Sequence, residues 1–377
     1  MEKENIEETI PVANTFLGEE EARAAYEAVK SGWISFLGPK VKEFEEAFAK
    51  EVDAKHAIAV NSGTSALHVA LAVMGIKEGD EVILPSLTFI STANAVLYQN
   101  AKPVLAECEP LTYNITAEEI EKRITKKTKA IIPVDMNGMP VDYDNILEVA
   151  NKYNIPVVAD SAESLGARYK GRKIGAIAPV HIFSFFPNKN ISTGEGGMIT
   201  TNDYELAKKM RIIMNQGQDK RYNHIALGYN YRMTNIQAAV GVEQLKRLHF
   251  ILNEKEKIAG KYNNMLKNCK NIRTPYVPEY VTKHAWYMYT ISIDNLDRDD
   301  IVRKLGEVGI ETRLSFPPIH IQPFYREKFG YKEDSLPVSF MAWKRLMNIP
   351  IWVGLNEKQD YVIRKIIKIC ENGRFKE

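Results

Sequence analysis

The stretch HAIAVNSGTSALHVALAVMG, residues 56–75, decides the fold that we predict from the sequence. It begins with the largely apolar segment 56–60, which is typical of a buried strand. Gly63 permits a tight turn, and the apolar residues from 66 onward are typical of a helix. A strand, a turn and a helix in this order are the repeating unit of α/β proteins.

This alternation continues to about residue 214 and predicts a mostly parallel sheet with helices on both faces. A long helix is then expected over 234–266, followed by Tyr- and Pro-rich segments and a last helix near 361–370. We therefore predict an α/β protein with a large domain of residues 1–245 and a smaller C-terminal domain of residues 246–377. The expected strands cover 56–60, 81–85, 102–107, 129–135 and 155–160, and the expected helices between and before them cover 41–52, 66–75, 91–100, 117–124 and 144–154.

Composition and charge exclude several classes of protein. The chain has 377 residues, of which 45% are hydrophobic, so it can form a substantial core. Its formal net charge of +2 gives no overall attraction to nucleic acid or to an anionic membrane. The three cysteines, Cys108, Cys269 and Cys370, are far apart, which suits a reducing compartment. The acidic N-terminus MEKENIEETI is unlike a signal peptide, and no apolar run approaches ~20 residues, so we expect a cytoplasmic protein that binds neither nucleic acid nor membranes.

Polar residues follow the predicted strands at the edge where open α/β sheets bind ligands. After strand 56–60, the amides and hydroxyls of Thr64 and Ser65 open a helix and can bind an anion; helix capping is the alternative. The segment IPVVAD, residues 155–160, ends in Asp160, which would need a cationic or donor partner if it is buried; a helix cap or a loop hydrogen bond is the alternative.

A third strand end lies in VHIFSFFPNKNISTGEGG, residues 180–197, where Ser184 is followed by Lys189 and a glycine cluster. A lone lysine is more often solvated. At the end of a buried strand, however, we expect burial to lower the pKa of the Lys189 amine and make it nucleophilic. An anion site, a carboxylate and an amine at neighbouring strand ends are what pyridoxal 5'-phosphate (PLP) requires for its phosphate, its ring nitrogen and its aldehyde.

Long segments of the chain also resemble the DegT/DnrJ/EryC1/StrS sugar aminotransferases, which have the aspartate aminotransferase fold (PLP fold type I). The resemblance covers nearly the whole chain and implies a large domain with a mostly parallel sheet, a smaller α+β domain and PLP as cofactor. The segments include SGWISFLGPKVKEFEEAFA (31–49), GDEVILPSLTFISTANAV (79–96), VVADSAESLGARYKGRKIG (157–175) and GYNYRMTNIQAAVG (228–241).

The resemblance implies roles at the PLP ring for four residues. Lys189 would be the Schiff-base lysine and would move a proton between the substrate carbon and the cofactor. Asp160 would pair with the pyridinium nitrogen, and Glu163 would lie near the ring hydroxyl. Phe89 would stack on the face of the ring.

The resemblance also implies how the phosphate is held. Thr64, Ser65 and Ser184 would contact it, beside the turn at Gly63. In this family the Asn of the GYNYRM motif, here Asn230, reaches the phosphate bound to the other subunit. We therefore expect a homodimer with shared active sites.

For the reaction, the resemblance implies transamination. L-glutamate would donate the amino group, leaving pyridoxamine 5'-phosphate, which aminates the ketone of a nucleotide-linked sugar. Lys189 excludes the dehydratase branch, which has His at this position. The motifs favour GDP-4-keto-6-deoxymannose, aminated at C4, as the sugar. The alternative substrates are UDP- or dTDP-linked 4-keto or 3-keto sugars. An alternative of another class is a non-catalytic regulatory or binding protein that has the PLP fold.

Substrate contacts are predicted for Arg313, His320 and Tyr231. Arg313 could bind a diphosphate through two parallel hydrogen bonds. A surface Arg and a packed His are the alternatives for Arg313 and His320.

Some residues depart from the family pattern. Asp135 stands where relatives commonly have His, and Pro179 and His181 stand where relatives usually have Gly-Asp-Ile. These changes lie near the predicted cofactor strands, so we expect them to affect the geometry of substrate binding more than the chemistry. No GxGxxG motif follows a strand, and GARYKGRK (166–173) lacks the lysine and hydroxyl of a nucleotide-binding loop. The spacing of His, Cys and carboxylates suggests no metal site.

Overall fold

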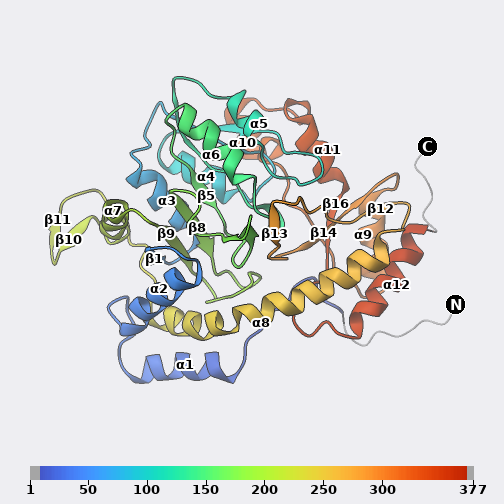
Figure 1. Ribbon diagram of the computed structural model, residues 1–377, viewed down its shortest axis with the longest axis horizontal. Coiled ribbons are helices and arrows are strands. Elements are labelled where there is room, and N and C mark those ends of the chain that lie inside the picture. The colour runs from blue at the N-terminus through green and yellow to red at the C-terminus, as the bar shows by residue number, and fades with distance from the viewer. Residues whose placement is uncertain (1–8, 372–377) are drawn as a thin grey trace.

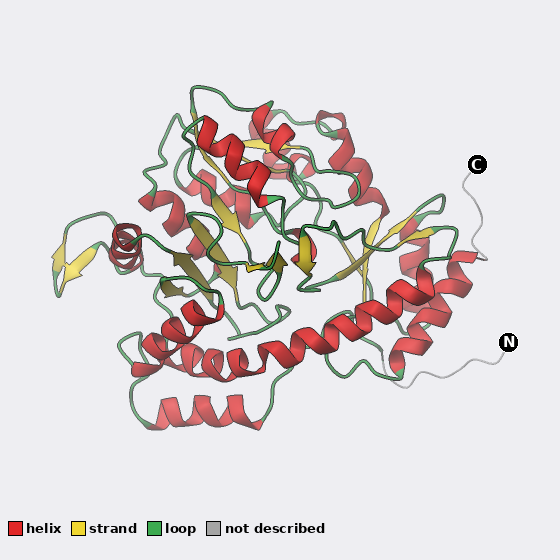
Figure 2. Cartoon of the chain, in the orientation of Figure 1, coloured by secondary structure: helices red, strands yellow, loops and turns green. Residues whose placement is uncertain are grey.

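The computed structural model describes residues 9–371, with a central sheet packed between helices (Figure 2). One part of the sheet has the parallel order β3-β2-β4, and the other has the order β5-β8-β9-β1. Parallel bridges from Ile131 to Val157 and from Val134 to Asp160 join the parts. Among these described strands, β9 runs antiparallel to both β1 and β8, and the other pairs are parallel, so the predicted mostly parallel sheet is confirmed. The strands are β1 (His56–Val60), β2 (Glu81–Pro85), β3 (Lys102–Ala106), β4 (Thr128–Ile131), β5 (Val158–Asp160), β8 (Val180–Ser184) and β9 (Gly197–Thr201).

Strand β1 shows why these strands are apolar along their whole length. Ala57 and Ala59 belong to one hydrophobic core, and Ile58 and Val60 belong to another. Successive side chains of a strand point to opposite faces, so both faces of the sheet are buried. The helices of this part are α2 (Pro39–Glu51), α3 (Gly63–Val73), α4 (Ser91–Tyr98), α5 (Ala117–Glu121), α6 (Tyr143–Lys152) and α7 (Tyr204–Met214).

Two strands stop well short of their predicted bounds, while β3 ends one residue early, at Ala106. Strand β4 ends at Ile131 rather than at 135, and β5 begins at Val158 rather than at 155. Pro133 and Pro156 have no amide hydrogen for the ladder, which interrupts regular pairing at these points.

The second part of the chain forms an antiparallel sheet with its own core. The sheet has the order β12-β14-β16-β15. Helix α8 (Asn235–Leu266) runs from the first part of the chain to the second (Figure 1). The predicted domain boundary at residues 245 and 246 lies within this helix and stays a prediction. Ile10 joins the second core and pairs with Ile310. The elements are β12 (Ile272–Arg273), β14 (Tyr289–Ile293), β15 (Arg313–Leu314), β16 (Leu346–Ile349), α9 (Arg298–Glu307) and α12 (Lys358–Glu371).

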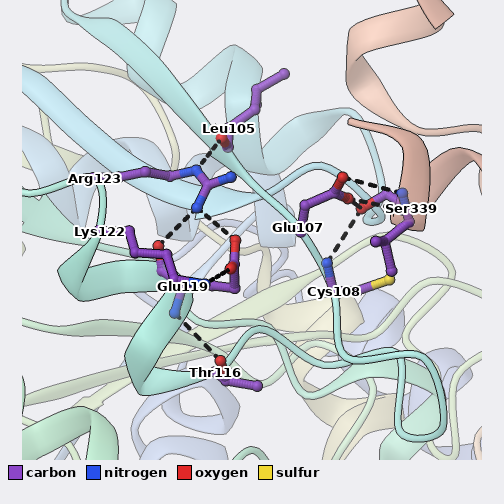
Figure 3. Close-up of polar contacts among 9 residues, drawn as sticks. Leu105, Glu107, Cys108, Thr116, Glu119, Lys122, Arg123 and Ser339 are labelled. Atoms are coloured by element: carbon purple, nitrogen blue, oxygen red, sulfur yellow. Dashed lines mark hydrogen bonds and ion pairs between the residues drawn. The ribbon is translucent and has the colours of Figure 1, made fainter. Parts of the chain in front are cut away.

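A carboxylate also links the two parts. Glu107, which follows β3, accepts hydrogen bonds from the amides of Val338 (3.0 Å) and Ser339 (2.8 Å) at the start of α11 (Pro337–Arg345). The Ser339 hydroxyl donates to Glu107 and accepts from the amide of Cys108 (Figure 3). A carboxylate is favourable at this end of a helix because it satisfies free amides and complements the helix dipole.

A hairpin of β10 (Gln218–Lys220) and β11 (Asn223–His224) projects from the body of the molecule (Figure 1). Within residues 9–371, no helix is long and apolar enough to cross a membrane, and no group of three or more His, Cys, Asp or Glu side chains is placed to hold a metal ion. The first eight residues of the acidic N-terminus lie outside the described part of the chain. The other elements are α1 (Glu19–Lys30), β6 (Arg168–Tyr169), β7 (Arg172–Lys173), β13 (Val281–Lys283), α10 (Pro323–Phe329) and three short 3₁₀ helices at Met136–Gly138, Ile319–Ile321 and Glu333–Ser335.

Candidate active site

A cavity of about 370 Å³ lies at the carboxyl ends of β5 and β8 and at the start of α3. This is the edge of the sheet that the sequence indicated. Ser65, Asn230, Tyr231, Arg313 and His320 are not among the residues that line it. The residues predicted from the sequence that do line it are Gly63, Thr64, Phe89, Asp160, Glu163, Ser184 and Lys189.

The start of α3 forms one end of the cavity. Ser62 caps the helix, and its hydroxyl accepts a hydrogen bond from the amide of Ser65 (3.1 Å). The Ser65 hydroxyl donates to Asn61 (2.7 Å). The helix cap is therefore Ser62, rather than Thr64 or Ser65. The amides of Gly63 and Thr64 precede the first intrahelical hydrogen bond, and such amides bind anions.

Close approach of strands and helix shapes this end. A Cβ atom on Gly63 would lie 2.9 Å from Cβ of Ser184, and one on Gly197 would lie 2.4 Å from the carbonyl oxygen of Ser62. Glycine therefore lets β8 and β9 reach the first turn of α3. The hydroxyls of Thr64 and Ser91, 2.8 Å apart, face the same cavity.

Asp160 is a buried carboxylate held by two donors. The Thr92 hydroxyl donates to its Oδ2 (2.9 Å), and the amide of Ala162 donates to its Oδ1 (3.3 Å). Burial raises the pKa of Asp160, while the hydrogen bonds and the charge of Lys189 oppose that rise. A cation beside Asp160 would therefore be stabilised.

Lys189 lies between a carboxylate and an aromatic ring. Its Nζ is 3.5 Å from Oε1 of Glu163 and 4.1 Å from the centroid of the Tyr287 ring. Glu163 is oriented by the amide of Asn137, which donates to Oε2 (2.7 Å). Burial by itself would lower the pKa of Lys189, but Tyr287, Glu163 and Asp160 together raise it. The sequence-based prediction of a lowered pKa for Lys189 is therefore wrong, because it did not count Tyr287 and the two carboxylates that act on the amine.

Several residues of the cavity were missed in the sequence. Thr92 and Ser91 lie at the start of α4, in the segment STANAV, where hydroxyls read as ordinary helix-start residues. Tyr287 comes from the far end of the chain, and no local pattern indicated it. Phe316 lies with its ring 5.3 Å from that of Phe89 and extends the apolar wall.

Two of the residues that depart from the family pattern, Asp135 and His181, meet at Ser161, the residue that follows Asp160. Oδ2 of Asp135 accepts hydrogen bonds from the hydroxyls of Ser161 (3.0 Å) and Tyr143 (2.8 Å). Ser161 also contacts Nδ1 of His181 (2.9 Å), whose Nε2 accepts from the amide of Ala178. Burial raises the pKa of Asp135 to about 6. Asp135 and His181 thus belong to one buried network outside the lining of the cavity.

The predicted substrate residues are scattered. Arg313 is exposed and lines a smaller hollow of about 60 Å³ that shares Tyr287 and Phe316 with the main cavity. His320 is fully buried, with Nδ1 2.7 Å from the Ser86 hydroxyl, so its placement does not support the predicted substrate contact.

The two neighbouring residues of the GYNYRM motif lie away from the main cavity. The Tyr231 hydroxyl is 3.0 Å from Nδ1 of His68. Asn230 is exposed and pairs with Asn215. Neither residue lines the cavity of its own chain.

Comparison with known proteins decides the family. The model of the DegT/DnrJ/EryC1/StrS aminotransferase family matches residues 16–367. The chain belongs to this family. The predicted fold, with a mostly parallel sheet in an α/β chain, and the predicted aminotransferase class are thereby confirmed.

Individual relatives are similar over almost their whole length. GDP-perosamine synthase from Caulobacter vibrioides is 44% identical, with 92% of this chain and 94% of the relative covered. The aminotransferase PseC from Helicobacter pylori, involved in the biosynthesis of pseudoaminic acid, has a TM-score of 0.91 at 27% identity, covering 97% and 100%. A Streptococcus pneumoniae protein has been solved in a PLP form (TM-score 0.92, 28% identity, covering 96% and 99%) and in a PMP form. The predicted cofactor thus agrees with the family.

The cavity of this chain fits PLP on its own chemistry. Amides at the start of α3 suit a phosphate, and the Asp160 carboxylate suits a protonated ring nitrogen. Lys189 supplies the amine, and the exposed ring of Phe89 supplies a flat apolar wall.

The burial of Asp160 predicts a pH-dependent gain in stability for Asp160→Asn in PLP-free protein. Folding raises the pKa of Asp160. The contribution of this group to the free energy of unfolding is therefore fully present below its pKa in the unfolded chain, near ~4, and is lost as the pH rises through its pKa in the folded protein. The variant escapes that loss. Urea unfolding of the PLP-free proteins should therefore give equal free energies of unfolding at pH 3.5, and the variant should become the more stable protein as the pH rises to 8. In a separate titration, the variant should bind PLP more weakly. A difference independent of pH would contradict this account.

Proposed function

We propose that this chain is a PLP-dependent aminotransferase that transfers the amino group of L-glutamate to a nucleotide-linked 4-keto-6-deoxy sugar, GDP-4-keto-6-deoxymannose, to give GDP-perosamine. The observation that carries the chemistry is the meeting of Lys189, Glu163 and Asp160 in one cavity beside the start of α3. An amine, a carboxylate that suits a protonated ring nitrogen and helix-start amides that suit a phosphate all face this one cavity.

Each residue has a defined task in this proposal. When bound, PLP supplies an electron sink for the bond that is broken at the substrate carbon. Lys189 Nζ holds the proton that is moved, and the carboxylate of Asp160 keeps its partner nitrogen protonated. Glu163 orients the amine of Lys189. Phe89 and Phe316 exclude water from one side of the cavity.

The sugar is proposed from similarity and from the surroundings of the cavity. The 44% identity to a GDP-perosamine synthase supports the GDP-linked 4-keto sugar. Arg313 lines the adjoining hollow, where it also pairs with Glu311 (3.4 Å), and its position supports a contact with an anionic group that extends from the main cavity. The aminotransferase PseC, which has this fold, is involved in the biosynthesis of pseudoaminic acid, so UDP- and dTDP-linked 4-keto and 3-keto sugars remain the alternatives here.

We also propose a homodimer in which Asn230 serves the partner's active site. Asn230 is exposed and lies outside the cavity of its own chain. The hairpin region before it carries apolar side chains that are strongly exposed, with Tyr222 at 79% and Leu227 at 83%. Exposed apolar side chains on a projecting segment favour burial against another protein surface.

The amino-transfer proposal predicts a reversible change in the visible absorption band of PLP-loaded protein. L-glutamate should remove the band, and GDP-4-keto-6-deoxymannose should restore it, because the two half-reactions exchange one amino group. Loss without return would contradict the GDP assignment. In that case the same assay with UDP- and dTDP-linked 4-keto and 3-keto sugars identifies the substrate.

Turnover by wild-type protein and by Lys189→Ala, measured beside sugar binding, separates an enzyme from a non-catalytic binding protein. Turnover should fall below about one thousandth of the wild-type value, because the amine that moves the proton is lost. Nucleotide-sugar affinity should stay within about threefold, since Lys189 is not the main sugar contact. Sugar binding by wild-type protein that shows no turnover with any of the keto sugars would instead establish the binding class.

A further inference from the structure

Helix α8 carries a row of polar side chains that faces the loop containing Lys189. Gln237, Gln244 and Lys255 are spaced by seven and then eleven residues. At about 3.6 residues per turn, these spacings equal about two and about three turns, so the three side chains lie on one face of the helix.

Each member of this row contacts the loop 185–197. Gln237 Nε2 donates to the carbonyl oxygen of Glu195 (2.7 Å). Gln244 Oε1 accepts from the amide of Ser192 (3.1 Å). The last member, Lys255, donates to Oδ1 of Asn190 (2.8 Å), the residue that follows Lys189. The helix therefore holds the loop at three successive points.

Lys255 also reaches the segment that covers Lys189 from the other side. Its Nζ donates to the carbonyl oxygen of Tyr287 (3.2 Å), and the ring of Tyr287 lies over the Lys189 amine. Asn190 completes the connection, because its Nδ2 donates to the carbonyl oxygen of Ala285 (2.8 Å). The carbonyl oxygen of Ala285 can only accept, so Nδ2 of Asn190 faces it, and Oδ1 of Asn190 is left to accept from the Lys255 amine.

The burial of Lys255 argues for a role beyond packing. Its exposed fraction is 6%, and the partners described for it are neutral oxygens rather than a carboxylate. Burial and the charge of Lys189 lower the pKa of Lys255 to about 7. A buried amine held by neutral partners costs free energy that an apolar side chain would not.

We propose that Lys255 is a positioning residue, which fixes the Lys189 loop against the Tyr287 segment and so sets where the Lys189 amine lies. It acts through Asn190 and the Tyr287 carbonyl and does not touch the reacting atoms. The catalytic part of this inference rests on the proposed function, whereas the order of the loop does not.

The test compares Lys255→Met with Lys257→Met, a matched control on the same helix whose side chain is 74% exposed. Amide hydrogen exchange of residues 186–192 in PLP-free full-length protein should be at least about tenfold faster in K255M and unchanged in K257M. The visible circular dichroism of bound PLP should fall by about half or more in K255M, and kcat should fall with KM nearly unchanged. A merely structural substitution elsewhere in α8 would not alter the dichroism of the cofactor.

Asn190→Ala tests the same connection from its other end and serves if K255M does not fold. It should reproduce both changes, and the K255M/N190A double variant should be within about twofold of the more severe single variant. Two results would overturn the proposal. One is a double variant in which the effects of the single variants on exchange and dichroism multiply; the other is exchange and dichroism within about twofold of wild type in both single variants. Absence of a PLP band in the wild type would contradict the proposed function alone, since the exchange measurement needs no cofactor.

Discussion

The structure of the site depends on one cation that faces two carboxylates inside the protein. Lys189 is 3.5 Å from Glu163, and the charge of Asp160 also acts on it. Burial raises the pKa of both carboxyl groups, while the carboxylates raise the pKa of the lysine. Two buried carboxylates that share one cation cost folding free energy, because one negative charge is left without a partner. The cluster is therefore poised to receive a second cation, which a protonated ring nitrogen beside Asp160 would supply.

The fold brings these charges together from elements that are distant in the chain. Asp160 ends β5, and Lys189 follows β8, the parallel neighbour of β5, so their positions at one edge come directly from the sheet. Tyr287 comes from the second part of the chain, which is tied to the first by α8 and by the Glu107 contacts with α11. Relative movement of the two parts would thus move the wall against which the amine rests.

Much of this was predictable from residues with a local pattern. Apolar runs such as β1 indicated buried parallel strands, and their ends indicated Asp160 and Lys189. Strand lengths were overestimated at Pro133 and Pro156, where the ladder lacks amide hydrogens. Other features depend on neighbours in space rather than in sequence. These are the sign of the Lys189 pKa shift, the hydrogen bond from Ser65 to Asn61 and the position of Tyr287 beside the Lys189 amine. No sequence pattern available for a single chain reports such neighbours.

Borohydride reduction of PLP-loaded protein, followed by digestion and mass spectrometry, tests the central claim most directly. It fixes the cofactor to the lysine that holds it and identifies that lysine by mass. The account predicts the phosphopyridoxyl label on Lys189, between Glu163 and Tyr287. A label on Lys255 or on any other lysine, or no label at all, would contradict it.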